Sequence, residues 1–381
     1  IHQIHRTLST RQGDIEAFIQ KLVELESPSG DEPGSRAVVA ALADAAERLD
    51  CVTTIEKVNV ESFGQNLLIK AFEKETSGQL LVVGHTDTVH RRGSLELRPW
   101  RHEAGRIFGP GIFDMKANCV LAVEVLRALN ELRIKPQVAV SLVLTCDEEV
   151  GSVSGWPFIE RVARADRTAF AMVLEPPSAD GRVKTGRKGT GIFSLRVEGK
   201  AAHAGLEPEK GASAILELAR QTERIHSINK AGAGISVNVG VVSGGTRSNV
   251  VAAEARAEID VRFSNEREAE EIEQFLLNLT PIDERTRVFV SGGINRPPLE
   301  RTPAVIELFE KARSIAKSID FELGEAQVGG ASDGNFLAAL GIPVLDGLGV
   351  NGDGAHADHE HIVAADLPIR GTLIASLIAS A

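Results

Sequence analysis

The stretch QLLVVGHTDTV, residues 79–89, decides the fold and the chemistry that we expect of this chain. Residues 80–83 form an unbroken apolar run with the length of a buried strand in a parallel sheet. Gly84 ends the run, and His85 and Asp87 follow two positions apart, so on an extended strand end they point to the same side. An imidazole and a carboxylate at a buried strand end favour a metal site, and the alternative is a histidine that is hydrogen-bonded to a nearby aspartate in a loop.

Length and charge limit the classes of protein to which the chain can belong. Its 381 residues exceed what one compact core usually serves, so we expect two domains. The net charge of −11 argues against nucleic acid and against an anionic membrane surface as partners.

Targeting signals and cysteines give an expectation for the compartment. No stretch has the length and apolar character of a transmembrane helix, and no signal peptide is visible. Cys51, Cys119 and Cys146 are too few and too scattered for a disulfide framework. We therefore expect a cytoplasmic protein, or a periplasmic or secreted one if a leader has been removed.

Strands and helices alternate in the first half of the chain. Apolar periodicity predicts helices over 14–25, 35–49, 118–132 and 156–164, and strands over 52–57, 66–72, 79–84, 138–145 and 170–174. Residues 91–106 have no period and are expected to form a surface loop. The alternation predicts an α/β fold in which helices flank a mostly parallel sheet.

The pattern changes after Lys184 and returns after Arg296. Between them we expect strands over 191–199, 236–243, 254–262 and 287–290, and helices over 211–227 and 266–279. This strand–helix–strand–strand–helix–strand order is that of an α+β layer of the ferredoxin-like kind. Helices over 304–315, 333–340 and 367–380 and a strand over 342–345 resume the first pattern. We therefore expect one domain in two parts, 1–186 and 297–381, with a second domain inserted over 187–296.

Further residues with metal-binding side chains follow other predicted strands and turns. Asp114 lies in a Gly-Pro-Gly turn before a helix, where a helix N-cap is a compatible role. Glu148 and Glu149 follow a second apolar strand; two adjacent carboxylates there need a shared cation or proton, unless they form a solvated acidic turn. Glu175 ends the next strand, and His356 lies in the Gly-rich stretch GDGAHADHEHI.

These residues together have the composition of a buried dinuclear site. The set contains two imidazoles and three carboxylates: His85, Asp114, Glu149, Glu175 and His356. Two divalent cations, three carboxylates and one hydroxide sum to zero charge, which suits a dinuclear hydrolytic centre. Nitrogen and carboxylate ligands without thiolate suit Zn²⁺, with Co²⁺ or Mn²⁺ able to substitute. Glu148 is then available as a general base, and Asp87 can orient His85.

Six motifs give the chain a family resemblance. In this order and spacing, GHTDTV, GPGIFDMK, CDEEVGS, LEP, AAHAG and GAHADHE resemble the dinuclear-zinc metallopeptidase and amidohydrolase family of glutamate carboxypeptidase (carboxypeptidase G type), succinyl-diaminopimelate desuccinylase, aminoacylase and acetylornithine deacetylase. The resemblance implies two Zn²⁺ on the five residues above, with Asp114 bridging them and the Asp114–Met115 bond cis. It also implies that Glu148 is the general base and that Asp87 is an acidic residue that assists catalysis from beside the metal ligands.

The resemblance assigns further roles to the inserted domain. It implies that this domain is a lid that forms a homodimer. His203 in the AAHAG motif would contact the substrate and its oxyanion, from the partner subunit. Asn249 and Arg296 would hold the terminal carboxylate of the substrate, for which the guanidinium fork of an arginine is well shaped. We expect His90 and His102 to lie at the surface.

The expected function is zinc-dependent hydrolysis of an amide or peptide bond next to a free C-terminal carboxylate, in a small peptide or an N-acyl amino acid. An N-acyl-amino-acid deacylase or a dipeptidase with the same site is the alternative. Val328 stands where glutamate-specific members carry a hydroxyl, so glutamate is not fixed as the substrate. A dinuclear phosphodiesterase would leave the AAHAG motif without a role, and a silent binding protein would leave Glu148 without one.

Overall fold

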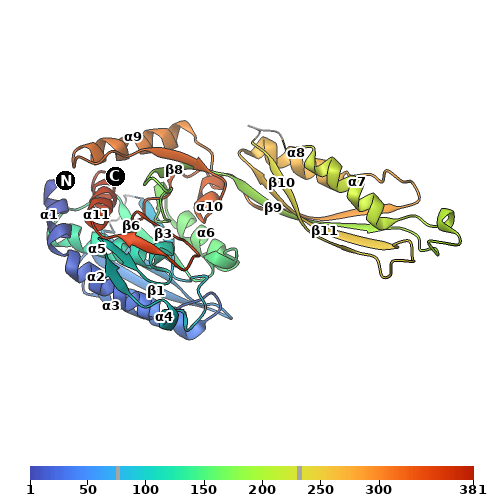
Figure 1. Cartoon of the computed structure of the whole chain (residues 1–381). Coiled ribbons are helices and arrows are strands. Elements are labelled where there is room, and N and C mark those ends of the chain that lie inside the picture. The colour runs from blue at the N-terminus through green and yellow to red at the C-terminus, as the bar shows by residue number, and fades with distance from the viewer. Residues whose placement is uncertain (74–77, 230–233) are drawn as a thin grey trace. The chain divides into compact units, whose positions relative to one another are not determined.

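The structure is a computed structural model of the 381-residue chain, and it describes residues 1–73, 78–229 and 234–381. The chain divides into two compact units (Figure 1). The first unit comprises Ile1–Thr185, Arg301–Gln327 and Ser332–Ala381, and the second comprises Gly186–Glu300 and Val328–Ala331. The second unit thus overlaps the insertion expected over 187–296 and adds residues at its end and a short segment further on.

A six-stranded sheet forms the centre of the first unit. Its strands are, in spatial order, β1 (Val52–Val60), β2 (Gly64–Ala71), β6 (Ala139–Thr145), β3 (Gln79–His85), β7 (Thr168–Val173) and β14 (Val344–Leu345). The pairings from β6 to β14 are parallel, whereas β1 and β2 add an antiparallel edge. Every residue of β3 and β6 is buried, which explains why their sequences are mostly apolar. The expected mostly parallel sheet is confirmed.

Two groups of helices pack on this sheet. One group contains α1 (His2–Thr10), α2 (Gln12–Glu24), α3 (Glu32–Glu47), α5 (Ala117–Glu131) and α11 (Asp366–Ala379), with α3 against β2 and α5 against β3. The other contains α6 (Gly155–Ala165) against β6 and α10 (Gly334–Ala339) against β7, and these two helices also contact each other, whereas α9 (Pro303–Lys317) packs against β14 and α11 and so belongs with the first group. The sequence pattern did not predict α1. Its buried residues, Ile4 and Leu8, are few, and it packs on α11 from the opposite end of the chain.

A small sheet brings together two segments that are distant in sequence. Its order is β15 (Gly352–Asp353), β16 (His361–Val363), β5 (Arg106–Phe108) and β4 (Arg101–Glu103). The surface loop expected over 91–106 is therefore wrong in part, because it contains α4 (Ser94–Leu97) and β4. The pairing of β5 with β16 places the turn after β5 next to the loop that precedes β16. The turn after β5 carries Asp114, and the loop carries His356.

The second unit has the expected ferredoxin-like order of elements. These are β9 (Gly189–Glu198), α7 (Ala214–His226), β10 (Ser236–Gly244), β11 (Glu254–Phe263), α8 (Glu266–Leu277) and β12 (Arg287–Arg296). The strands form one antiparallel sheet in the order β10-β11-β9-β12, with α7 and α8 on one face (Figure 1). Alternate residues of β9 and β11 are buried, as expected for a sheet whose other face is exposed. Phe193 and Leu195 are among the residues that form its core.

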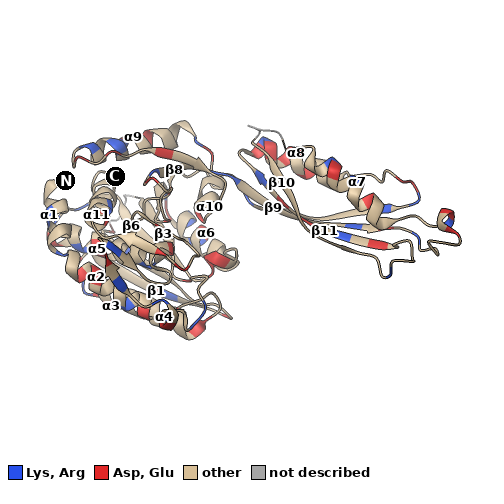
Figure 2. Ribbon diagram, viewed as in Figure 1, with Lys and Arg blue, Asp and Glu red and all other residues tan. Residues whose placement is uncertain are grey.

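Charged residues of both signs are interspersed on the helices of both units (Figure 2). Several form pairs one helical turn apart, such as Arg164 with Glu160 and Arg267 with Glu271. A further strand pair consists of β8 (Val183–Arg187) and β13 (Glu325–Val328). Every helix in the described part of the chain is too short or too polar to span a bilayer.

Candidate metal centre

The acidic and imidazole side chains converge at the carboxyl edge of the parallel strands. His85 is the last residue of β3, and Glu149 lies in the short helix η2 (Glu148–Val150), which follows β6. Glu175 follows β7. Asp114 comes from η1 (Ile112–Lys116), just ahead of α5, and the Asp114–Met115 bond is cis, which confirms that expectation. In open α/β sheets this edge is the usual place for a site, because parallel strands end there together.

The distances define two groups of donor atoms. Nε2 of His85 lies 3.2 Å from Oδ1 of Asp114 and 3.5 Å from Oε1 of Glu175. Nε2 of His356 lies 3.3 Å from Oδ2 of Asp114 and 3.1 Å from Oε2 of Glu149. Within each group the donor atoms all lie within 4.8 Å of one another. The structure thus brings together all five residues that the sequence singled out, and Asp114 belongs to both groups through different oxygens.

Two observations on the described residues test whether divalent cations fit here. Oε1 of Glu149 is buried and accepts no hydrogen bond, so this side chain retains one uncompensated acceptor. The donors are imidazole nitrogens and carboxylate oxygens, a set that suits Zn²⁺. The nearby thiol of Cys119 donates to the backbone oxygen of His85 at 3.0 Å instead of joining either group. The residues present therefore fit a dinuclear centre.

The carboxylates and imidazoles shift one another's protonation. Hydrogen bonds to Asp114 and Glu149 raise the pKa of His356 to about 10. Burial acts to lower the pKa of His85, but hydrogen bonds to Asp114, Asp87 and Glu175 outweigh it and raise this pKa well above its usual value. For Asp114, burial acts to raise the pKa, yet the two imidazoles hold it below the usual range. Burial raises the pKa of Glu149.

His356 occupies a backbone conformation that few residues adopt. Its φ of 64° lies in the left-handed region, where histidine is more frequent than most side chains but still uncommon. Such conformations gather at functional sites, because the surrounding structure must hold them. The turn in residues 354–357, closed by a hydrogen bond from Ala357 to the oxygen of Gly354, sets this conformation.

Asp87 connects His85 to the Glu148–Glu149 segment. Its carboxylate is 2% exposed and accepts hydrogen bonds from the backbone N–H groups of Glu148 and Glu149, both at 3.2 Å. Its Oδ1 lies 3.4 Å from Nδ1 of His85, and its Oδ2 accepts a hydrogen bond from Ser29 Oγ at 2.7 Å. The buried carboxylate of Asp87 thus contacts the imidazole of His85, in one donor group, and holds the backbone of Glu149, in the other. This arrangement matches the orienting role expected of Asp87.

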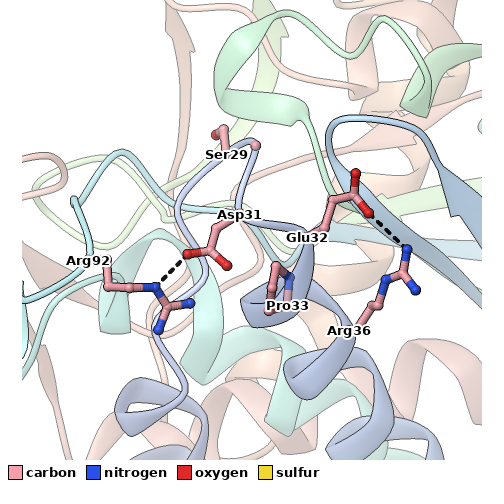
Figure 3. A pocket seen from close by; sticks show the side chains of 7 residues that line it. Ser29, Asp31, Glu32, Pro33, Arg36 and Arg92 are labelled. Atoms are coloured by element: carbon pink, nitrogen blue, oxygen red, sulfur yellow. Dashed lines mark hydrogen bonds and ion pairs between the residues drawn. The ribbon is translucent and has the colours of Figure 1, made fainter.

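A surface hollow lies on the other side of Ser29. Figure 3 shows its lining, in which Asp31 pairs with Arg92 and Glu32 pairs with Arg36. Asp31 also caps α3 by accepting from the N–H of Gly34 at 2.8 Å. The charged groups drawn there therefore pair with one another across the loop and the start of α3.

Glu148 lies next to the two groups but belongs to neither. Its backbone N–H is held by Asp87, and its side chain is half-buried. Among the described residues, the donor groups use Glu149 and not Glu148. Adjacent residues of a tight turn direct their side chains differently, so Glu148 is available for a task other than holding a metal.

The residues expected to contact substrate belong to the second unit. His203 and Asn249 are exposed and lie on paired segments, with Ala204 donating to the oxygen of Asn249 at 3.0 Å and His203 bridged to Val250. Arg296 is buried at the end of β12. Their substrate-binding roles stay predictions.

Two residues beside the site were not recognised from the sequence, Glu360 and His90, and His90 was also placed wrongly. His90, expected at the surface, is only 8% exposed, because it pairs with the carboxylate of Glu360. Glu360 was not singled out, although it stands four residues after His356 in a motif already quoted. Its partners are backbone N–H groups of the Asp114 turn, which leave no mark in the sequence. His359 is exposed and His361 is buried beside Phe108, and neither belongs to a donor group of the described residues.

Comparisons with known proteins agree with this geometry. A sequence profile of the peptidase family M20/M25/M40 matches residues 81–380. Carboxypeptidase G2 of Pseudomonas sp. (strain RS-16) is 29% identical over 375 residues, which cover 94% of this chain and 87% of that protein. Succinyl-diaminopimelate desuccinylase of Delftia acidovorans is 27% identical over 375 residues, which cover 92% of this chain and 94% of that protein.

Solved structures show the same fold. Aminopeptidase PepT from Bacillus cereus superposes with a TM-score of 0.77 at 22% identity, covering 97% of this chain and 98% of that one. The YXEP protein of Bacillus subtilis, described as a dinuclear metal binding peptidase from the M20 family, has a TM-score of 0.72 at 13% identity, covering 97% and 98%. At these identities the likeness concerns the architecture.

We expect two metal ions per chain when the protein is prepared without chelators and saturated with zinc. Metal analysis of wild type should be compared with Asp114→Asn and Glu175→Gln. Because Asp114 belongs to both donor groups, its variant should lose both ions, whereas the Glu175 variant should lose affinity in one group. Zinc affinity should also fall as the pH is lowered, because protons and metal compete for the imidazole of His356. A saturated wild type with one ion or none would contradict the dinuclear assignment.

Proposed function

The chain belongs to the peptidase family M20/M25/M40, and from this premise we propose that it is a zinc-dependent carboxypeptidase. It is a metallopeptidase or amidohydrolase by family, and the proposal concerns the bond that it cleaves: an amide or peptide bond next to a free C-terminal carboxylate. The observation that carries the proposal is the carboxylate of Asp114, which faces one imidazole with each oxygen. A bridging carboxylate between two cations is what hydrolysis by a dinuclear centre requires.

The chain's own residues supply positioning and proton transfer. When bound, two Zn²⁺ ions would act as Lewis acids that make water more acidic and stabilise negative charge on the carbonyl oxygen. His85, Glu175 and Asp114 would hold one ion, and His356, Glu149 and Asp114 the other. Glu148 would accept the proton of the attacking water and donate it to the leaving nitrogen, which a carboxylate beside the centre can do in both directions.

Similarity to named relatives supports the choice of bond. Carboxypeptidase G2 carries a carboxypeptidase name and aligns with nearly the whole chain. The desuccinylase aligns just as fully, so removal of an N-acyl group from an amino acid, or cleavage of a dipeptide, is the second candidate with the same centre. Both kinds of reaction break an amide and need the same acid–base residue. They differ in which side of the bond the enzyme recognises.

Arg296 and Asn249 are our candidates for recognising the terminal carboxylate. Arg296 ends β12, and Asn249 follows the Gly-rich turn between β10 and β11. A guanidinium offers two parallel N–H groups to a carboxylate, and an amide adds a further donor. His203, paired through its backbone with the Asn249 segment, would contact the oxyanion.

Glu148→Gln should separate proton transfer from metal binding. The amide keeps the shape of the side chain and cannot accept the proton, so we expect kcat to fall at least about 100-fold while both metal ions remain. Glu103→Gln, an exposed change in β4, serves as a control that should retain wild-type kcat. Loss of metal together with activity would instead place Glu148 among the ligands.

A comparison of free-acid and amidated substrates tests the bond assignment. Wild type should cleave a peptide or N-acyl amino acid with a free terminal carboxylate far faster than its C-terminal amide. Arg296→Ala should lower kcat/KM for the free acid, because the substrate carboxylate loses its charged partner. The ratio of the rates on free acid and amide should therefore fall. Equal rates of wild type on acid and amide would refute the carboxypeptidase proposal and leave the deacylase.

We propose further that the protein is a homodimer formed through the second unit. β10 is an edge strand of its sheet, and Val241 and Val242 near its end are 55% and 62% exposed. An apolar edge strand promotes pairing with another chain, and a two-fold axis would pair it with its own copy. In such a dimer His203 would act on the metal centre of the partner subunit.

Hybrid dimers test the action of His203 across subunits. Glu148→Gln and His203→Ala chains should each be inactive alone. After mixing and verified subunit exchange, one site of a hybrid would hold both intact residues, so partial activity should return. Absence of recovery, with exchange confirmed by differently tagged chains, would mean that His203 acts within its own chain or has no catalytic role.

A further inference from the structure

Glu360 is a buried acidic side chain next to the metal centre that has four hydrogen-bonding partners. It is 3% exposed and follows His356 by four residues. Its Oε1 accepts hydrogen bonds from the N–H groups of Phe113 at 2.8 Å and of Asp114 at 3.0 Å, and its Oε2 accepts one from Gly111 at 2.8 Å. Oε2 also contacts Nε2 of His90. One carboxylate thus takes three backbone N–H groups and an imidazole.

The three N–H groups form a concave anion site in the turn that bears Asp114. Successive N–H groups of a tight turn point inward in this way and favour a negative charge at their centre. Gly111 makes the turn feasible, because its φ of 70° is left-handed and a Cβ there would lie 2.4 Å from Cγ2 of Thr88. The carboxylate of Glu360 occupies the place that a bound anion takes in other proteins.

Glu360 joins the segments that carry the donor atoms. The Asp114 turn binds its carboxylate, and its own backbone belongs to the loop of His356, which turns back through the hydrogen bond from Glu360 N–H to the oxygen of Ala357. His90 belongs to the segment that continues from His85 and Asp87. Nδ1 of His90 lies 3.3 Å from Nη1 of Arg98, which pairs with Asp358 in the same loop as Glu360.

We infer that Glu360 is a positioning residue, which holds the carboxylate of Asp114 at the point shared by the two donor groups. The inference rests on the proposed metal centre and adds to it a residue that binds no metal. Asp114 belongs to both donor groups through different oxygens, so a small rotation of its backbone would move the carboxylate out of one group or both. The N–H of Asp114 itself is one of the groups that Glu360 fixes, and the anchor is therefore one bond from the Cα of the bridging residue.

Glutamine cannot replace glutamate at this position. In one orientation its amide nitrogen would face the N–H groups of Phe113 and Asp114, and in the other it would face Gly111 and His90. Either way donors oppose donors in a buried place, and unpaired buried donors destabilise the arrangement. The variant should therefore displace the Asp114 turn while leaving all five donor side chains present.

The experiment uses Co²⁺ as the probe and compares wild type with Glu360→Gln, with Glu103→Gln as the surface control. Affinity is measured by competition with a chelator, and the visible spectrum of the bound Co²⁺ reports the geometry of its ligands independently of turnover. We expect Co²⁺ affinity to fall about 10- to 100-fold in Glu360→Gln, with an altered spectrum, as found when partners that orient ligands are changed. The control should match wild type in both measurements.

The outcomes separate this inference from the proposed function. Wild type that binds no Co²⁺ would refute the metal centre itself, and the inference with it. Wild-type affinity and spectrum in a folded Glu360→Gln would overturn the inference alone. If Glu360→Gln does not fold, His90→Ala replaces it; that change leaves the three N–H bonds to Glu360 in place. Because Glu360 loses one of its four partners, the bound Co²⁺ should show a spectrum altered from that of wild type, and an unchanged spectrum would overturn the inference.

Discussion

The structure depends on one electrostatic constraint, the gathering of carboxylates at the edge of a parallel sheet. Asp114, Glu149 and Glu175 lie within the two groups of donor atoms that share Asp114, and Asp87 lies directly beside His85. Carboxylates so close together repel, and their burial adds to the unfavourable free energy unless positive charge is present. Two imidazoles supply part of that charge, and two divalent cations would supply the rest. The same requirement explains both the raised pKa of His356 and the lowered pKa of Asp114.

The fold meets this constraint by bringing three rigid strand ends together with two loops whose flanking strands pair with each other. Strands β3, β6 and β7 are adjacent and parallel, so their ends deliver His85, Glu149 and Glu175 to one edge without further adjustment. The other two donors come from turns, which need support of their own. The pairing of β5 with β16 brings the two turns close together, and the carboxylate of Glu360 then holds the Asp114 turn through hydrogen bonds to its backbone. Asp87 has the corresponding task at the strand ends, since it fixes the backbone of Glu148 and Glu149.

The sequence predicted the features that show as a pattern in consecutive residues, and it missed the features that depend on partners elsewhere in the fold. The buried strands and the five donor side chains were predicted, because apolar runs followed by acidic or imidazole residues are visible in one dimension. The short strands β4, β15 and β16 were not predicted, since two or three residues carry no period, and the pairing of β16 with β5 joins segments that are distant in the chain. His90 was placed wrongly at the surface, because its burial depends on Glu360. Glu360 itself has backbone partners, and a backbone N–H has no identity that a sequence can show.

The division into two units has a consequence for how chemistry and specificity are related. All the donor atoms, with Glu148, Asp87 and Glu360, belong to the first unit, whereas His203, Asn249 and Arg296 belong to the second. Hydrolysis of any amide makes the same demands on the first set: a shared carboxylate, a proton acceptor and fixed turns. In our proposal, recognition of a terminal carboxylate or of an acyl group would fall to the second. Under this proposal, substitutions at Arg296 or Asn249 would change the choice of substrate and leave undisturbed the residues that would hold the metal, which agrees with the similarity of this chain both to a carboxypeptidase and to a desuccinylase.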